Sequence, residues 1–158
     1  MAGMDRRSAL GAAALMTGMA AAGSAANAAP RPRKLSAAQQ LDALASRAAI
    51  EEVLYDYARG NDHNDEAMIR QCFWPESAHK HGGFDGTSAG FVDFAMRLLP
   101  KLKYCKHHIS NVSVRVKGNR AFSECYYYVH HRRDAASGSG EEDIFCEGRY
   151  IDLFERRG

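Results

Sequence analysis

Three long stretches of alternating apolar and polar residues dominate the second half of the chain. They cover residues 104–117, 120–133 and 143–156 and are rich in Val, Tyr, Ile and Phe, a pattern typical of strands with one buried face. Turn-forming residues separate them at 117–119 and at 135–141. Because such short connections join neighbouring antiparallel strands, the pattern predicts a meander of three long strands.

Helical spacing precedes these strands. Apolar residues recur at i, i+3, i+4 and i+7, which predicts a helix from Leu35 to a natural stop at Gly60. We expect shorter helices over about 65–73 and 91–99, each closed by a following proline, and an alternating segment that turns on glycines at 77–86. Helices followed by a curled sheet predict an α+β domain in which the helices cover one face of the sheet and leave a pocket.

The composition fits one ordinary domain, since 46% of the 158 residues are hydrophobic and 25% are charged. Removing residues 1–28 takes away two of the 21 basic and one of the 19 acidic residues, so the remaining charges nearly balance. A nearly neutral chain creates no electrostatic field that would attract a nucleic acid or an anionic membrane, and we expect neither as a partner.

The first 28 residues have the features of an export signal. The pair Arg6-Arg7 precedes a small-residue apolar run over 9–22 and the cleavage pattern at 26–28. The arginine pair indicates twin-arginine export, and therefore a periplasmic or secreted protein; an ordinary secretory signal and an uncleaved anchor are the alternatives. We expect residues 29–37 to be a linker and residues 38–158 to form the domain.

The cysteines and histidines raise the question of metals and disulfides. Cys72, Cys105, Cys125 and Cys146 contain no closely spaced pair of the kind that structural zinc sites use, and their disulfide state stays open. His79 and His81 share a strand face, and His130-His131 invite a metal interpretation, but no carboxylate–histidine motif accompanies them. We therefore predict no metal site.

Asp62 and His107 each have a structural explanation when taken alone. Asp62 precedes a predicted helix and another acid follows at Asp65, which is a common arrangement at a helix N-terminus. His107 and His108 are adjacent on a predicted strand, so only one of the two rings can face inward.

A resemblance to other sequences favours a functional role for these two residues. The order of elements, together with AIEEVLYDYARGND at 49–62 and CKHHISN at 105–111, resembles the SnoaL-like branch of the NTF2-like superfamily over about residues 40–157. The stretches DALASRAAI at 42–50 and LFERRG at 153–158 are similar to the branch that contains hexachlorocyclohexane dehydrochlorinase, scytalone dehydratase and bile-acid dehydratase. This resemblance implies a cone-shaped α+β barrel with three N-terminal helices packed on a curved antiparallel sheet. It also implies a lyase without cofactors that removes water or hydrogen halide from a small hydrophobic cyclic substrate.

The resemblance also assigns roles to residues. The family acid falls on Asp62, the family histidine on His107, and a tyrosine five residues before the acid on Tyr57. Asp62 would orient the imidazole, His107 would abstract a proton, and Tyr57 would donate a hydrogen bond. Trp74 and His79 fall where relatives have aromatic residues near the pocket.

The strand register suggests further pocket residues. Pairing through the turn at 117–119 places position 107 opposite 129, which gives as substrate-binding candidates Ile109, Asn111, Tyr127 and Val129, with Cys125 and His131 on the same face. A slip of one residue would present Glu124, Tyr126, Tyr128 and His130 instead. The apolar alternation of Val112, Val114 and Val116 belongs to the face opposite His107, a conflict that a subunit interface or a β-bulge would resolve.

Relatives continue past the ERRG segment with a turn and one more strand, whereas this sequence stops at Gly158. We therefore expect a C-terminally truncated domain; completion by a partner chain and a weakened relative are the alternatives. We also expect a homo-oligomer, either dimer or trimer. The rival functions are a non-catalytic module that binds hydrophobic ligands or dimerises, and a metal-dependent hydrolase that uses the histidine pairs.

Overall fold

The computed structural model describes residues 34–157, so the predicted export signal over 1–28 lies outside the described residues. The elements follow in the order α1 (Ala37–His63), α2 (Glu66–Gln71), β1 (Ala78–His81), β2 (Phe84–Thr87), α3 (Ser88–Leu98), the 3₁₀ turn η1 (Leu99–Lys101), β3 (Tyr104–Lys117), β4 (Arg120–Asp134) and β5 (Glu141–Glu155). Within this part of the chain, none of the helices has the length and apolar character that a membrane crossing requires. The predicted α+β class is confirmed.

Helix α1 begins and ends at well-formed caps. Ser36 forms a capping box with Gln39 at the start, and Asn64 closes the end in the left-handed conformation with φ of 56°. The predicted stop at Gly60 is therefore wrong by three residues. Gly60 instead lets α2 approach, because a Cβ atom there would lie 2.8 Å from Cγ1 of Ile69. The consequence is that Asp62 lies inside the last turn of α1.

The cap of the next helix is a different acid. The carboxylate of Asp65 accepts a hydrogen bond from the backbone N–H of Met68 at 3.0 Å and so caps α2. The helix-cap explanation for Asp62 is thereby removed, since Asp65 already fills that position.

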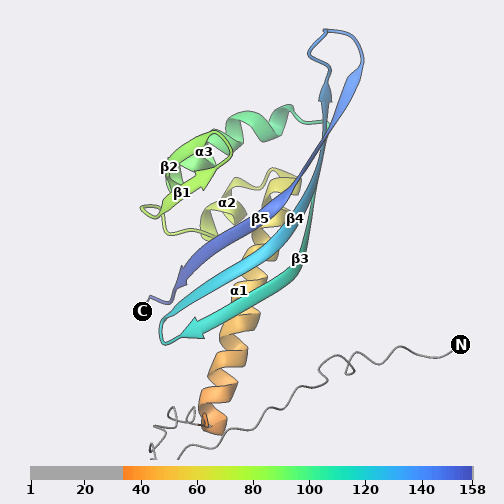
Figure 1. Ribbon diagram of the computed structural model, residues 1–158. Helices are drawn as coiled ribbons and strands as arrows, with labels where there is room; N and C mark the ends of the chain where they lie inside the picture. The colour runs from red at the N-terminus through yellow and green to blue at the C-terminus, as the bar shows by residue number, and fades with distance from the viewer. Residues whose placement is uncertain (1–33, 158) are drawn as a thin grey trace, which may run out of the picture. The chain divides into compact units, whose positions relative to one another are not determined.

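The three predicted strands form one antiparallel sheet in the order β3–β4–β5. His107 pairs with Val129, as the turn at 117–119 predicted. Figure 1 shows α1 running along the sheet, with α2, α3 and the β1–β2 hairpin on the same side. The hairpin corresponds to the segment that was predicted to alternate and turn on glycines.

A β-bulge interrupts β3. The register with β4 shifts between Ser110 and Ser113, and Asn111 takes a left-handed φ of 54° inside the shift. Because the extra residue reverses the alternation, His107 before the bulge and Val114 after it face the same side. This bulge resolves the conflict between the inward histidine and the inward valines.

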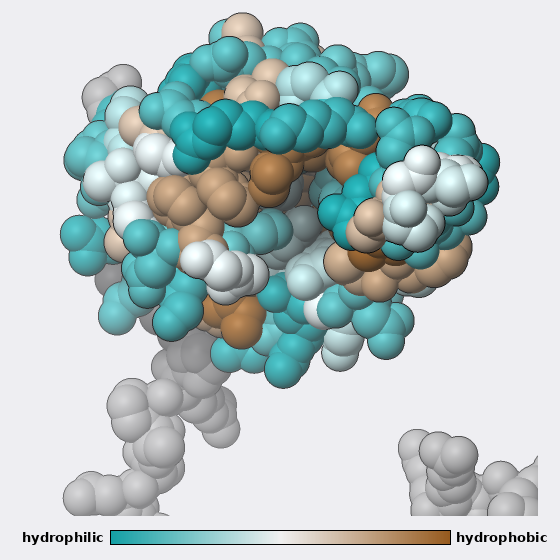
Figure 2. All heavy atoms as spheres, turned by 90° about the horizontal axis from the view of Figure 1, so that it is seen from above, coloured by the Kyte–Doolittle hydropathy of each residue, from teal (hydrophilic) through white to brown (hydrophobic). Residues whose placement is uncertain are grey.

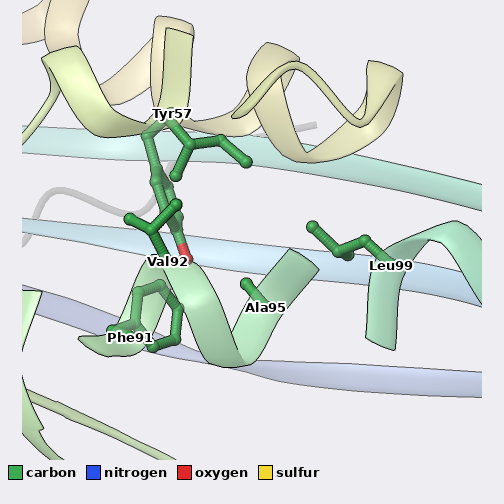
Figure 3. Packing of buried hydrophobic residues seen from close by; sticks show 6 residues of the cluster. Tyr57, Phe91, Val92, Ala95 and Leu99 are labelled. Carbon is green, nitrogen blue, oxygen red and sulfur yellow. The ribbon is translucent and has the colours of Figure 1, made fainter. Parts of the chain in front are cut away.

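Two clusters of buried side chains hold the helices on the sheet. One lies among the helices and comprises Tyr57, Ile69, Phe91, Val92, Ala95 and Leu99 (Figure 3). The other lies between α1 and the sheet and comprises Ile50, Leu54, Val114, Ala121 and Cys125. Tyr150 packs against both clusters. Burying an Ile, Leu or Val side chain stabilises a fold by about 1.5–3 kcal/mol, so these clusters fix the C-terminal half of α1, from Ile50 onward, against the sheet.

The opposite face of the sheet carries a row of exposed apolar side chains, which we call the outer patch. Strand pairing places them together: Phe122, Tyr126 and Tyr128 on β4, and Phe145, Ile151 and Leu153 on β5. Leu153 is 86% exposed and Ile151 is 59% exposed. No element within residues 34–157 covers this patch.

Candidate active site

The site is built where the end of α1 meets the free edge of β3. Asp62 Oδ1 accepts a hydrogen bond from His107 Nδ1 at 2.7 Å. The backbone N–H of His107 donates to the same carboxylate, at 2.9 Å to Oδ1 and 3.1 Å to Oδ2. The His107 side chain is only 6% exposed and that of Asp62 is 20% exposed. Since β3 is an edge strand, its outward N–H has no strand partner, and Asp62 provides the acceptor that it needs.

This contact fixes the state of the imidazole. A carboxylate that accepts from Nδ1 requires the proton on that nitrogen, so Nε2 carries the lone pair. The charged carboxylate also stabilises an imidazolium ion if Nε2 takes up a proton. The pair therefore has the chemistry of an oriented general base.

Cys105 joins the pair from the same face of β3. Its thiol donates to Asp62 Oδ1 at 3.7 Å, and its Sγ lies 3.8 Å from His107 Nδ1. Burial, together with the negative charge of Asp62, raises the pKa of Cys105 to about 12, so the thiol stays protonated. The sequence interpretation missed this contact, although a cysteine two residues before a strand histidine necessarily shares its face.

Two further imidazoles flank His107. His131, the cross-strand partner of Cys105, has its ring centroid 6.0 Å from that of His107. The Nε2 atom of His131 is buried and has no hydrogen-bond partner. Burial lowers the pKa of both His131 and His81, and the neighbouring His107 adds to the effect. Both rings are therefore neutral near neutral pH.

Tyr57 lies within reach of this group but is also a core residue. Its ring meets that of His107 edge-on, with centroids 6.4 Å apart, and the residue is 7% exposed. Figure 3 shows its side chain extending from α1 toward α3. Burial raises the pKa of the Tyr57 hydroxyl, which therefore remains a hydrogen-bond donor at any physiological pH.

An open depression between α1 and β3 gives access to the pair. Its lining includes Arg59 and Asp62 from α1, and His107 and Ile109 from β3, with the exposed ring of Tyr55 at one side. Figure 2 shows the domain from above, with a hollow bordered by both hydrophobic and hydrophilic side chains. Such a mixed border suits a ligand with an apolar body and a few polar groups.

The remaining predicted pocket residues lie on the inner face of the sheet. Val129 is buried opposite His107, and Tyr127 stacks on Tyr150 with ring centroids 4.3 Å apart. Ile109 packs against the α1–sheet cluster and also reaches the depression.

Comparison with known proteins identifies the family. The sequence profile of the SnoaL-like domain matches residues 42–158. The chain belongs to the SnoaL-like domain family. No curated protein matches the sequence.

Solved structures resemble this SnoaL-like domain in fold. A candidate scytalone dehydratase from Novosphingobium aromaticivorans is 18% identical with a TM-score of 0.65, and the match covers 75% of this chain and 78% of that one. An NTF2-like superfamily protein from Salmonella enterica is 18% identical with a TM-score of 0.62, over 72% and 81% of the two chains. A candidate dehydratase of the NTF2-like family from Streptomyces avermitilis is 11% identical with a TM-score of 0.57, over 73% and 88%. At these identities the likeness establishes the fold.

Three predicted site residues of the SnoaL-like domain make other contacts. Trp74 Nε1 donates to the backbone oxygen of Glu155 at 3.3 Å, and the Arg157 guanidinium lies 4.4 Å from the Trp74 ring centre. His79 stacks on Phe91 with centroids 3.8 Å apart. Asn111 is exposed in the bulge. The structure gives these residues packing or backbone roles, and it gathers Asp62, His107 and Tyr57 without them.

The two histidine pairs considered for a metal differ in how their rings are oriented in this SnoaL-like domain. His130 faces outward and its Nε2 lies 2.7 Å from Asp143 Oδ1, whereas His131 faces inward. His79 and His81 do stack on one face, with centroids 6.0 Å apart. Among residues 34–157, the group of metal-type ligands that does converge is Asp62, Cys105 and His107.

Proposed function

We propose that this SnoaL-like domain is a cofactor-independent lyase of the dehydratase or dehydrohalogenase type. The observation that carries the proposal is the shielded hydrogen bond between Asp62 and His107, which leaves Nε2 of the imidazole free to act as a base. General base catalysis typically accelerates a reaction by about 10² to 10⁴.

The reaction follows from this geometry. His107 Nε2 takes a proton from a carbon of the substrate, the electrons of the broken C–H bond form a C=C bond, and the C–X bond breaks as X departs. Halide leaves as the anion, whereas hydroxide takes up a proton and leaves as water. The imidazolium formed at His107 is stabilised by Asp62 and returns its proton to hydroxide or to solvent.

Departure of X or growth of enolate charge needs a hydrogen-bond donor. Tyr57 is the proposed donor, because its ring meets that of His107 and its buried hydroxyl keeps its proton; the residue lies behind the depression and does not line it. One donor aimed at developing charge is typically worth about 10² to 10³ in rate.

The substrate class is inferred from the surroundings. Ile109 lines the depression together with Ala58 and the exposed ring of Tyr55, and these apolar and aromatic side chains favour a small hydrophobic ring. Two structural neighbours are described as candidate dehydratases, and this supports the same reaction class.

We also propose that the protein acts outside the cytoplasm after twin-arginine export, and that two or more copies associate. The arginine pair and apolar run of the first 28 residues support export. The outer patch supports association, because exposed apolar side chains gathered on one sheet face usually mark an interaction site; the Glu124–Arg149 ion pair lies among them.

The test is proton abstraction by the full chain on a panel of cyclic β-hydroxy ketones and cyclic halides. The expected result is loss of water or halide from at least one compound, or deuterium exchange at its acidic carbon in D₂O. His107→Ala should reduce the rate by about 10² to 10⁴, and His130→Ala, on the outer face, is the matched control. A ligand that binds tightly with no turnover and no exchange would instead show a binding module.

A further inference from the structure

We propose that Asp62, Cys105 and His107 bind a zinc ion, and that the bound ion switches off the base. The triangle of donor atoms carries the proposal: Cys105 Sγ lies 3.7 Å from Asp62 Oδ1 and 3.8 Å from His107 Nδ1, and these two atoms are 2.7 Å apart. All three donor atoms lie within 4.8 Å of one another.

These distances resemble one face of a tetrahedral zinc site. With Zn–S near 2.3 Å and Zn–N and Zn–O near 2.0 Å, adjacent ligand atoms stand about 3.3 to 3.5 Å apart. Both sulfur distances exceed this range only slightly. The Asp62–His107 distance must open by about half an ångström, a movement that small side-chain rotations provide.

The chemical types of the donors select the metal. One thiolate, one imidazole and one carboxylate form a borderline-soft set that suits zinc and excludes magnesium and calcium, which prefer oxygen ligands alone. The charges of thiolate and carboxylate together neutralise a divalent ion, so the half-buried site gains no net charge.

His131 provides an independent observation that points to the same ion. It is the cross-strand partner of Cys105, and its buried Nε2 has no hydrogen-bond partner. A buried nitrogen without a partner is destabilising unless something occupies it. His131 stands outside the group of donor atoms that lie within 4.8 Å of one another, so its ring would have to move toward Cys105 to become the fourth ligand.

Zinc binding changes where the protons lie. The Cys105 thiol loses its proton to solvent, and His107, bound through Nδ1, carries its remaining proton on Nε2. The nitrogen that would accept the substrate proton then has no lone pair. The metal site itself does not depend on the proposed lyase activity, whereas the inhibition does rest on it.

The first experiment uses the full chain, without an affinity tag and with a phosphine reductant, titrated with Co²⁺ and then Zn²⁺. The expected result is one cobalt ion per chain with a thiolate-to-cobalt charge-transfer band, displaced by zinc. Zinc affinity should rise about tenfold per pH unit, because one thiol proton is released per ion. No binding near one equivalent, or a band without thiolate character, would overturn the proposal.

Variants locate the site. Cys105→Ser should abolish the charge-transfer band and weaken zinc by more than the roughly 100-fold that follows loss of an outer-shell partner. Cys146→Ser removes an exposed thiol and should leave both unchanged. A band that survives Cys105→Ser but disappears in Cys146→Ser would place the ion elsewhere. His131→Ala should weaken zinc and retain the band.

Inhibition is measured separately on any substrate or exchange reaction found, relative to the metal-free rate of each variant. Zinc should inhibit the unmodified chain and have at least tenfold less effect on Cys105→Ser. One thiolate-bound cobalt per chain with no detectable turnover would contradict the lyase and keep the metal site, whereas turnover insensitive to zinc would contradict the switch.

Discussion

Asp62 connects the end of α1 to β3 through a single carboxylate. It accepts from the ring and from the backbone of His107 at once, and the Cys105 thiol also donates to it. A carboxylate held by several donors has little freedom to rotate, so the imidazole is fixed both in tautomer and in direction. The same carboxylate stabilises the edge of the sheet, which links the fold and the proposed chemistry.

A second acidic residue, Asp152, lies on the inner face of the sheet without a comparable set of hydrogen-bond donors. Asp152 stands opposite Ser123 on the inner face, and burial raises its pKa to about 6. Its neutral form is thus favoured on folding. Below the unfolded value of about 3.9 the group is protonated in both states and has no effect on stability. As the pH rises from about 4 to about 6, the unfolded chain ionises first and the folded protein loses stability relative to it; above about 6 the loss is complete.

Asp152→Asn should therefore be more stable than the unmodified chain above pH 6, by roughly 3 kcal/mol at most, because a shift of one pKa unit corresponds to about 1.4 kcal/mol. The difference should vanish near pH 4. Urea unfolding at several pH values measures both. Asp85→Asn, at an exposed acid, is the control. A stability difference that does not depend on pH would contradict the assignment of this penalty to Asp152.

Helix α1 and helix α2 meet at Gly60, and this contact sets where α1 ends. The missing side chain lets Ile69 sit against the helix, and α1 continues to His63, which places Asp62 at the edge of β3. The bulge at Asn111 plays a similar part in β3, because it keeps His107 and Val114 on one face. Both devices position the site without touching it.

Gly60→Ala tests the first of these devices. The added Cβ would lie 2.8 Å from Ile69 Cγ1, and overpacking of this kind costs about 1–3 kcal/mol, more than the gain of up to about 1 kcal/mol in helix propensity. We expect a net loss of stability in urea unfolding. Gly83→Ala, where a Cβ meets nothing within 4 Å, is the matched control. Equal stability of the two variants would show that α2 does not depend on close approach at Gly60.

The proposed association between copies would involve the outer patch. The outer patch exposes large apolar side chains on two neighbouring strands, including Phe145, which is 57% exposed. A second copy placed against this face would remove the patch from water at about 25 cal/mol per Å² of apolar area.

Leu153→Lys and Ile151→Lys should each convert the proposed oligomer to monomer, because a lysine ammonium group placed in an apolar interface loses its hydration. Sedimentation velocity over a range of protein concentrations measures the change. Lys80→Glu, on the β1–β2 hairpin, is the control for altered charge. A monomer in the unmodified chain at all concentrations would contradict association through this patch.

The sequence predicted correctly the features that depend on residues close together in the chain. Periodicity of two and turn residues at 117–119 located the strands and placed His107 opposite Val129, since side-chain alternation and a short turn together determine the register. The apolar spacing identified α1 but placed its end at Gly60, three residues too early. The sequence does not distinguish a glycine that ends a helix from a glycine that allows another helix to pack closely, as Gly60 does.

The partners of Asp62 were decided only by the tertiary structure. The acid and His107 are 45 positions apart, and the contact between them exists because α1 packs along the free edge of β3. Resemblance to relatives pointed to the two residues, but local patterns equally allowed Asp62 to be a cap, a role that Asp65 fills. Cys105 and His131 joined the site for the same reason. Contacts between distant segments depend on how buried faces fit together, which no local spacing encodes.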